Sequence, residues 1–424
     1  MKTDVIIVGC GVAGLYCALN LPKEKGILML TKSKAEESDS FLAQGGICVL
    51  RDEGDYESFR EDTMRAGHYE NNPESVDIMI SSSPKVIEDL VRFGAEFERE
   101  GDGFAYTKEG AHSSPRILFH EDETGKEITG ALLRTVRERE NITLVENFTV
   151  VDLIAQDNSC LGIVGHNEEG EYSAFYADYT VLATGGIGGL FKHSTNYRHL
   201  TGDSVAMALN HNIKLKNIDY IQIHPTTLYT EEKGREFLIS ESVRGEGAIL
   251  LNSKGERFVD ELQPRDVVTN AIHEEMKKEG TAHVWLSLEN IPKEEILTHF
   301  PNIYRQCLDV GYDITKESIP VVPSQHYFMG GIDVDKYSRS SMDRLYAVGE
   351  TSCNGVHGKN RLASNSLLES LVFARRAALH ITDNYSEGQH TQEITIDPEK
   401  YIDYPTQYRK AVLDAIEKER NTNE

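Results

Sequence analysis

Three apolar runs at distant places in the chain each end at glycine. Residues 4–8 (DVIIV), 179–184 (YTVLAT) and 344–348 (RLYAV) are followed directly by glycine. A nearly continuous apolar run of this length is typical of a strand that is buried on both faces of a parallel sheet. We therefore predict one sheet that is assembled from segments far apart in the sequence.

The amino-terminal residues follow the order strand, tight turn, helix, strand. The first strand leads into Gly9–Gly14, a helical stretch continues to Leu21 and ends at Pro22, and residues 26–30 form a second strand. In this context the G-x-G-x-x-G pattern predicts a dinucleotide site. Its glycines allow a tight turn, close approach of the backbone to a pyrophosphate, and packing of helix on strand. A turn without a ligand is the alternative.

The second strand departs from the usual dinucleotide pattern. It ends in Thr31 and Lys32, where Asp or Glu normally binds the adenosine ribose. The hydroxyl group of Thr31 and the ammonium group of Lys32 can still bind a ribose and its neighbouring phosphate. Further turns can complete a flavin cradle, although each alone can be a capped turn or helix start. These turns are residues 44–46, 201–203, 349–350 and 364–368.

The middle and the end of the chain differ in pattern from the rest. Residues 225–325 are mixed and more polar, with short helices such as 267–278, which predicts an inserted domain. Beyond Ser386 the chain is polar, and residues 407–419 read as one amphipathic helix.

The charge excludes several classes of partner. The 424 residues carry 44 basic and 69 acidic side chains, so the formal net charge is −25. This charge argues against nucleic acid or an anionic membrane as the partner. An anionic substrate must therefore be captured by a local cluster of Arg or His side chains. No apolar stretch approaches the roughly 20 residues that a membrane helix needs, and we see no signal region.

The cysteine and histidine patterns predict neither disulfides nor a metal site. The six cysteines include no C-x-x-C pair, which favours reduced thiols in a cytoplasmic protein. The chain contains neither His-x-x-x-His nor clustered Cys, so we predict no bound metal.

A series of motifs resembles the flavoprotein family that contains succinate dehydrogenases, fumarate reductases and L-aspartate oxidases. The motifs stand in the order found in that family, and the match runs from residue 4 to about residue 380. They are Gly9–Gly14, Ala43–Ile47, Ala183–Gly186, His224–Thr226, Arg244–Gly247, Pro264–Asp266, His326–Gly331 and Arg361–Glu369.

The resemblance implies an α/β fold with a Rossmann-like FAD-binding domain, residues 1–224 and 326–385, interrupted by an α+β capping domain, residues 225–325. Residues 386–424 would form a short helical segment where the family usually has a longer helical domain. The resemblance places the dicarboxylate substrate between the two domains. It assigns FAD contacts to Gly9, Cys10, Gly11, Val12, Ala13, Gly14, Thr31, Lys32, Asp39, Ser40, Phe41, Ala43, Gln44, Gly45, Gly46, Asp203, Glu350, Ser366 and Leu367.

Within this family the sequence looks most like the L-aspartate oxidases. The resemblance implies oxidation of L-aspartate to iminoaspartate, with hydride passing from Cα to flavin N5. It implies that the electrons go to O2, giving H2O2, or to fumarate. The reaction is the first step of quinolinate and NAD synthesis, which suggests a functional link to quinolinate synthase. The alternatives are a soluble fumarate reductase or succinate dehydrogenase-type subunit, and a non-catalytic flavoprotein docked on an iron–sulfur partner.

Two residues bear on the choice within the family. Asp39 stands where members with covalent FAD have the linking His, so the resemblance implies noncovalent FAD. Glu109 matches the acidic residue that aspartate oxidases place near the substrate amine. The alternative is that Glu109 is an exposed loop charge beside Lys108 and Gly110.

The resemblance also assigns the substrate contacts. Arg361 and His326 match the residues that clamp one carboxylate, and His224 with Ser240 matches the pair that holds the other. Arg suits this task because a guanidinium group binds a carboxylate in a bidentate manner. Gln222 can add a neutral amide contact.

The catalytic assignment leaves two alternatives. The resemblance implies that Arg265 is the proton-transfer residue and that the proton is relayed through Glu241 and Arg244. Arg in proteins effectively keeps its proton, however. The alternative is therefore that Arg265 only stabilises the bound dianion electrostatically.

Overall fold

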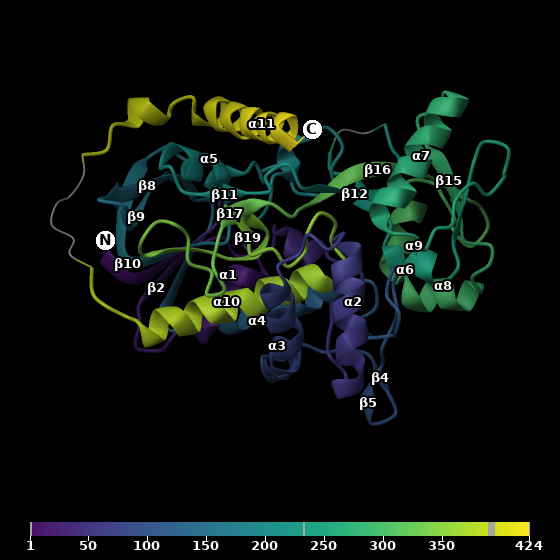
Figure 1. The fold of residues 1–424 in the computed structure, drawn as a ribbon, viewed down its shortest axis with the longest axis horizontal. Helices are drawn as coiled ribbons and strands as arrows, with labels where there is room; N and C mark the ends of the chain where they lie inside the picture. The colour runs from purple at the N-terminus through teal and green to yellow at the C-terminus, as the bar shows by residue number, and fades with distance from the viewer. Residues whose placement is uncertain (1, 232–233, 389–394, 424) are drawn as a thin grey trace.

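The computed structural model describes residues 2–231, 234–388 and 395–423, which form a larger and a smaller lobe (Figure 1). The larger lobe is built on a seven-stranded sheet of order β7-β2-β1-β10-β9-β8, with β18 paired to β10. Its strands are β1 (Lys2–Val8), β2 (Ile27–Leu30), β7 (Ile142–Val145), β8 (Thr149–Gln156), β9 (Ser159–His166), β10 (Tyr172–Leu182) and β18 (Leu345–Ala347).

The predicted assembly of distant segments into one sheet is confirmed. β1 pairs in parallel with β10, Val5 opposite Tyr179, and β10 pairs in parallel with β18, Thr180 opposite Leu345. The antiparallel extension of this sheet by β9 and β8 was not predicted from the sequence. Asp157 and Asn158 connect these two strands, both with positive φ, as in the tight turns that favour hairpins. This Asp-Asn pair was the available signal.

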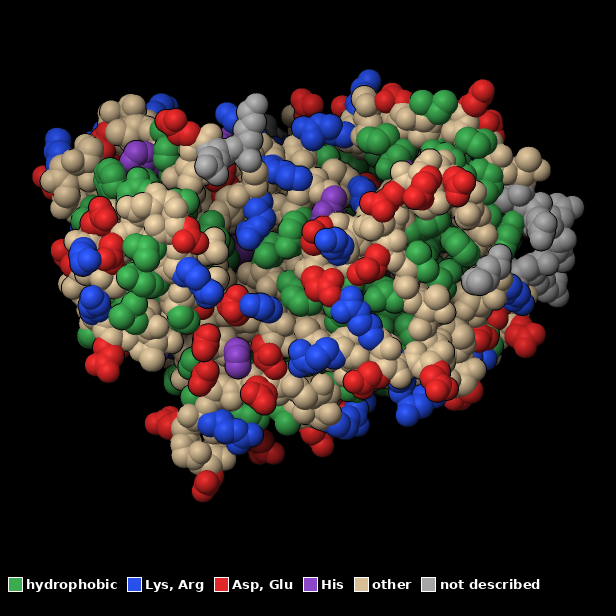
Figure 2. Space-filling view, turned by 180° about the vertical axis from the view of Figure 1, so that it is seen from behind, with side chains coloured by type: hydrophobic (Ala, Val, Ile, Leu, Met, Phe, Trp, Pro, Cys, Tyr) green, Lys and Arg blue, Asp and Glu red, His purple; other side chains and the backbone are tan. Residues whose placement is uncertain are grey.

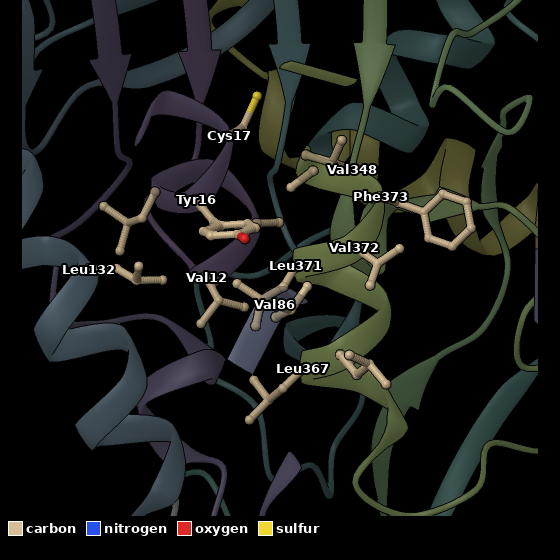
Figure 3. Packing of buried hydrophobic residues seen from close by; sticks show 14 of the residues in the cluster. Val12, Tyr16, Cys17, Val86, Leu132, Val348, Leu367, Leu371, Val372 and Phe373 are labelled. Atoms are coloured by element: carbon tan, nitrogen blue, oxygen red, sulfur yellow. The ribbon is translucent and has the colours of Figure 1, made fainter. Parts of the chain in front are cut away.

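Helices cover both faces of the large sheet, and alternate residues of β1 explain why. Val5 and Ile7 pack into one hydrophobic cluster, whereas Ile6 and Val8 pack into another. The first cluster includes side chains of α1 (Val12–Asn20), α3 (Pro73–Arg92), α4 (Thr124–Arg137) and α10 (Asn365–Asp383). Figure 3 shows residues of α1 and α10, among them Tyr16 and Leu371, meeting in this cluster.

The opposite face is covered by α5 (Asp203–Asn210) and by the end of the chain. α11 (Tyr404–Asn423) lies along α5 in Figure 1 and includes the predicted helix 407–419. Its side chains Tyr408, Val412 and Ile416 are buried in the second cluster. Within the described residues, no helix is both long and apolar enough to cross a bilayer.

The smaller lobe contains a five-stranded sheet of order β13-β12-β16-β15-β14. Its strands are β12 (Ile221–Leu228), β13 (Phe237–Leu238), β14 (Ile249–Leu251), β15 (Val284–Ser287) and β16 (Ile319–Phe328). Four helices belong to it, α6 (Glu241–Gly245), α7 (Arg265–Glu279), α8 (Lys293–His299) and α9 (Pro301–Asp309). The predicted domain boundaries at 225 and 325 fall inside β12 and β16, and the exact partition stays a prediction.

Short elements complete the chain. They are η1 (Asp39–Leu42), β3 (Ile47–Cys48), η2 (Glu53–Asp55), α2 (Tyr56–Ala66), β4 (Arg99–Glu100), β5 (Gly103–Phe104), β6 (Ile117–Leu118), η3 (Gly188–Leu190), β11 (Leu215–Lys216), β17 (Gly331–Asp333), η4 (Gly349–Thr351), β19 (Ser352–Cys353) and η5 (Pro398–Tyr401).

The turn between β1 and α1 requires glycine because the backbone segments lie so close together. Gly9 has φ +114°, and a Cβ there would lie 2.0 Å from the carbonyl oxygen of Ala183. A Cβ on Gly14 would lie 2.1 Å from the carbonyl oxygen of Gly9. The missing side chains therefore let the first turn of α1 sit against the end of β1, at the edge where β10 also ends.

This close approach predicts opposite effects for the same substitution at two helical glycines. Gly14→Ala should lower the free energy of unfolding by about 1–3 kcal/mol, because the added methyl group meets backbone atoms. Gly130→Ala in α4 should raise it by about 0.5–1 kcal/mol, since its Cβ would meet only Arg134 Nη1 at 3.4 Å and Phe41 at 4.0 Å. Urea unfolding followed by circular dichroism measures both. The same sign in the two variants would contradict the packing of α1.

Candidate functional site

A cavity of about 360 Å³ lies between the two lobes. This size falls in the range of small-molecule and cofactor sites, about 300–1,000 Å³. Of the residues predicted to contact FAD, all except Gly14 line the cavity, because Gly14 packs on Gly9 instead. On the face shown in Figure 2, Lys and Arg side chains gather along the boundary between the lobes.

Lys32, one of the two residues that depart from the usual dinucleotide pattern, has polar partners at one end of the cavity. Lys32 Nζ donates to Asp203 Oδ2 at 2.8 Å and to Thr201 Oγ1 at 3.1 Å. The apolar side chains of Phe148 and Val150 line the cavity as well. The structure thus brings together Lys32 and Asp203, which the sequence places in separate turns.

The carboxyl groups of two partly buried residues, Asp39 and Glu350, line the cavity. Asp39 Oδ1 accepts a hydrogen bond from the Tyr197 backbone N–H at 3.0 Å, and burial raises the pKa of Asp39 to about 7. Glu350 accepts from the Phe328 N–H at 2.9 Å. Burial, and then the charge of Asp39, raise the pKa of Glu350 to about 8.

Several polar groups in the cavity wall lack protein partners, which fits a polar ligand. Among the described residues, Asp39 Oδ2, Gln44 Oε1 and Ser38 Oγ are buried without a hydrogen-bond partner. An unsatisfied buried polar group costs about 1–3 kcal/mol, and a bound ligand with donors and acceptors removes that cost. Together with the glycine turn at the start of α1, this wall fits a dinucleotide such as FAD.

At the other end of the cavity, two guanidinium groups share one acceptor. Gln222 Oε1 accepts from Arg265 Nη1 at 2.9 Å and from Arg361 Nε at 3.2 Å. Gln222 Nε2 donates to Asn360 Oδ1 and to the Arg361 carbonyl oxygen, each at 2.8 Å. Both arginines line the cavity, whereas Gln222 is absent from its lining and so lies behind them.

Arg361 is further held by an aromatic ring. Its guanidinium carbon lies 4.3 Å from the ring centroid of Tyr327, a cation–π distance, and Nη1 donates to Ser366 Oγ. Burial, and then the nearby charge of Arg265, lower the pKa of Arg361 to about 10. Arg361 therefore remains a cation at neutral pH.

Two histidines stand beside these cations and are neutral. The rings of His224 and His326 have centroids 5.2 Å apart. Burial and the neighbouring guanidinium groups lower the pKa of both well below the usual range. His326 Nδ1 lies 2.7 Å from Thr195 Oγ1. His224 lines the cavity, and its Nε2 has no hydrogen-bond partner among the described residues.

Glu241 links Arg265 to Arg244. Its Oε2 lies 2.5 Å from Arg265 Nε and 3.5 Å from Arg244 Nη2. Burial opposes ionisation of Glu241, but the two guanidinium groups outweigh it, so the pKa of Glu241 is lowered. Arg244 does not line the cavity, and its Nη1 donates to the Glu261 carbonyl oxygen at 2.5 Å. Ser240 lines the cavity at the amino end of α6, where its hydroxyl accepts from the Ser242 N–H.

Glu109 is buried in the cavity wall at only 3% exposure, which excludes the alternative of an exposed loop charge. Its carboxylate accepts from Ser242 Oγ at 3.0 Å and from Ser364 Oγ. Burial, and then the charge of Glu241, raise the pKa of Glu109. A positively charged ligand group beside Glu109 would stabilise its buried carboxylate.

Several residues that hold this site in place were not predicted from the sequence. Tyr327 lies next to His326 in a predicted motif and Ser242 next to Glu241, so adjacency was the available signal. Thr195 lies in no predicted motif and gave no signal. No cluster of side chains that could hold a metal ion occurs among the described residues. Chemically, the cavity end offers two cations, two neutral imidazoles and two carboxylates to a small dianion that carries an amine, and one of the carboxylates, Glu241, is already paired with Arg265.

Comparisons with known proteins identify the family of this chain. A family model described as an FAD binding domain matches residues 4–367. An L-aspartate oxidase of Clostridium perfringens is 50% identical over 417 residues, covering 97% of this chain and 94% of that protein. An L-aspartate oxidase of Clostridium acetobutylicum is 53% identical over 390 residues, covering 91% and 89%. The structure of the FrdA subunit of E. coli quinol fumarate reductase is 29% identical with a TM-score of 0.86, covering 99% of this chain and 74% of that one.

The paired guanidinium groups predict that the cavity binds dicarboxylates. Arg361→Leu should weaken succinate binding about 10- to 150-fold, because a charge-assisted contact contributes about 1.5–3 kcal/mol. Isothermal titration calorimetry measures the affinity. Arg376→Leu is the control, since Arg376 contacts the Lys336 carbonyl oxygen outside the cavity. Unchanged succinate affinity in Arg361→Leu would place the dianion elsewhere.

Proposed function

The chain belongs to the FAD-binding family that includes the L-aspartate oxidases and fumarate reductases, and from this premise we propose that it oxidises L-aspartate to iminoaspartate. The observation that carries the proposal is the buried carboxylate of Glu109, at the same end of the cavity as Arg265 and Arg361. A site for a simple dicarboxylate needs the cations but has no use for this carboxylate.

The two substrate carboxylates bind to different elements of the site. Arg361 and His326 bind one carboxylate, and His224 with Ser240 binds the other. Arg361 is rigid because Gln222 and Tyr327 both hold it, so little side-chain freedom is lost on binding. Neutral histidines donate hydrogen bonds without adding to the repulsion between Arg265 and Arg361.

The substrate ammonium group binds to Glu109. Among the guanidinium groups an added cation would be repelled, and a carboxylate is the simplest remedy. Ser242 and Ser364 hold the two oxygens of Glu109, so its position is fixed before the substrate arrives.

Arg265, Glu241 and Arg244 form a continuous chain of contacts beside the substrate position. The Glu241 carboxylate forms ion pairs with both guanidinium groups. We therefore favour an electrostatic role for Arg265, stabilising the dianion, over removal of a proton by Arg265.

FAD supplies the two-electron acceptor of the oxidation when it is bound. The residues that would hold it are the glycine turn before α1, Lys32, Asp203, Glu350 and the start of α10. Aspartate at position 39 lacks an imidazole, so we propose noncovalent binding. We further propose O2 or fumarate as the electron acceptor, a cytoplasmic location, and a functional link to quinolinate synthase.

Fumarate reduction is a second candidate, supported by the likeness in fold to fumarate reductase. It uses the same cations and does not require the amine contact of Glu109. The relative rates of the two reactions therefore separate the candidates.

Noncovalent FAD predicts complete release of the cofactor on denaturation. Acid precipitation of the purified holoprotein should leave all of the yellow colour in the supernatant, because Asp39 offers no linking nitrogen. Absorbance of the supernatant and pellet measures the partition. Flavin retained in the washed pellet would contradict the proposal.

The substitution Glu109→Gln should distinguish the contribution of the substrate amine from that of the substrate carboxylates. We expect flavin reduction by L-aspartate under anaerobic conditions to slow about 10- to 150-fold, because the ammonium loses a contact of about 1.5–3 kcal/mol. Fumarate reduction should be little changed. Stopped-flow absorbance measures the first reaction, and Glu100→Gln in the exposed strand β4 is the control.

Two outcomes would count against this proposal. Bleaching of the wild-type flavin by succinate but not by L-aspartate would remove L-aspartate as the substrate. Equal losses on both substrates in Glu109→Gln would remove Glu109 from the specificity of the site.

A further inference from the structure

A buried network of charged side chains lies behind the loop that carries Glu109. Arg116 is fully buried and forms a forked contact with Asp55, Nε to Oδ2 at 3.1 Å and Nη2 to Oδ1 at 2.9 Å. Its Nη1 donates to Asp62 Oδ2 at 2.7 Å. Neither Arg116 nor its carboxylate partners line the cavity, so the substrate does not contact them.

His112 connects this network to the opposite wall of the site. Its Nδ1 lies 3.1 Å from Arg116 Nη1, and its Nε2 lies 3.1 Å from the carbonyl oxygen of Ala363. A guanidinium group can only donate, so Nδ1 must be an unprotonated acceptor. The ring proton of the neutral imidazole is therefore on Nε2, from which it donates to Ala363.

The surroundings keep His112 neutral. Burial lowers the pKa of His112 to about 4, and Arg116 acts in the same direction, against the bond to Ala363 and the carboxylates of Asp62 and Glu241. The charged and titratable groups around the ring are Arg116, Asp62, Glu241 and Cys48. Because Arg116 fixes the proton on Nε2, the direction of the hydrogen bond to Ala363 is also fixed.

Two loops of the substrate site meet at His112. Its backbone N–H lies 3.3 Å from the Glu109 carbonyl oxygen and closes a turn in which Ala111 has φ +65°. Ala363 stands between Arg361, which lines the cavity, and Ser364, whose hydroxyl holds Glu109. The His112 imidazole thus connects the backbone segment that carries Glu109 to the backbone segment that carries Arg361.

We propose that His112 is a positioning residue that sets the distance between Glu109 and Arg361, and thereby the preference for an amino dicarboxylate over one without an amine. The inference rests on the proposed function and adds a residue that does not touch the substrate. If the spacing changes, a carboxylate and an ammonium on one substrate no longer reach their partners together. A dicarboxylate without the amine does not depend on that spacing.

Two substitutions of His112 each keep one of the two hydrogen bonds of the ring and remove the other. Gln can place an amide nitrogen near the position of Nε2 and donate to Ala363, but it offers Arg116 no acceptor at Nδ1. Asn can place its oxygen near Nδ1 and accept from Arg116, but it is too short to reach Ala363. His112→Gln and His112→Asn therefore form a matched pair.

The test compares kcat/KM for L-aspartate oxidation and for fumarate reduction in the holoenzyme. In His112→Asn we expect the ratio of the two values to fall about tenfold, the loss of roughly one hydrogen bond. In His112→Gln the ratio should stay near that of the wild type. An equal change of the ratio in both variants, or no change in either, would overturn the proposal. FAD content and the thermal unfolding midpoint are measured for each variant, so that a folding defect is recognised.

A spectroscopic measurement on the wild-type holoenzyme tests the inference without relying on activity. Two-bond ¹H–¹⁵N correlation spectra of the histidine rings should show the His112 ring in the neutral Nε2–H form from about pH 5.5 to 8. Its signal is assigned by its loss in His112→Gln. An Nδ1–H form, or protonation of this ring in that range, would overturn the inference. A wild-type enzyme that reduces fumarate but does not oxidise L-aspartate would instead overturn the proposed function.

Discussion

A single amide oxygen, Oε1 of Gln222, lies between two buried guanidinium groups that would otherwise repel each other. The rest of the site follows from this arrangement. Arg265 requires the carboxylate of Glu241, and the histidines beside the cations are uncharged because further positive charge is unfavourable there. This end of the cavity therefore carries positive charge, and each buried guanidinium group there has a polar or charged partner. A local cluster of this kind lets a protein with a negative net charge bind a dianion.

The fold supplies part of this arrangement through two neighbouring strands of the five-stranded sheet. In the antiparallel pair β12 and β16, Gln222 lies opposite Tyr327, the residue whose ring holds Arg361. The register shifts next to Gln222 and again after His224, and such irregularities change the direction in which side chains point. The site therefore depends on strand register more than on any one loop.

Sequence patterns predicted the parts of the molecule that local chemistry determines. The apolar runs of β1, β10 and β18 had to be buried on both faces, and the glycines before α1 had to lie close to backbone. Patterns also brought out the motifs that converge on the cavity. They could not predict that Gln222 lies behind Arg265 and Arg361, or that His112 reaches Ala363. Those relations arise between residues 43 to 251 positions apart in the sequence and depend on packing, which no local pattern encodes.

The position of Arg265 at the first residue of α7 has a consequence for the energetics of the whole chain. Arg265 belongs to the smaller lobe, whereas Arg361 belongs to the larger one, and both donate hydrogen bonds to Gln222 on β12. A dianion held by both arginines therefore contributes its binding energy to the docking of the lobes. Occupancy of the cavity makes the two lobes behave as one cooperative unit, so local opening of the smaller lobe becomes rarer as the dicarboxylate concentration rises.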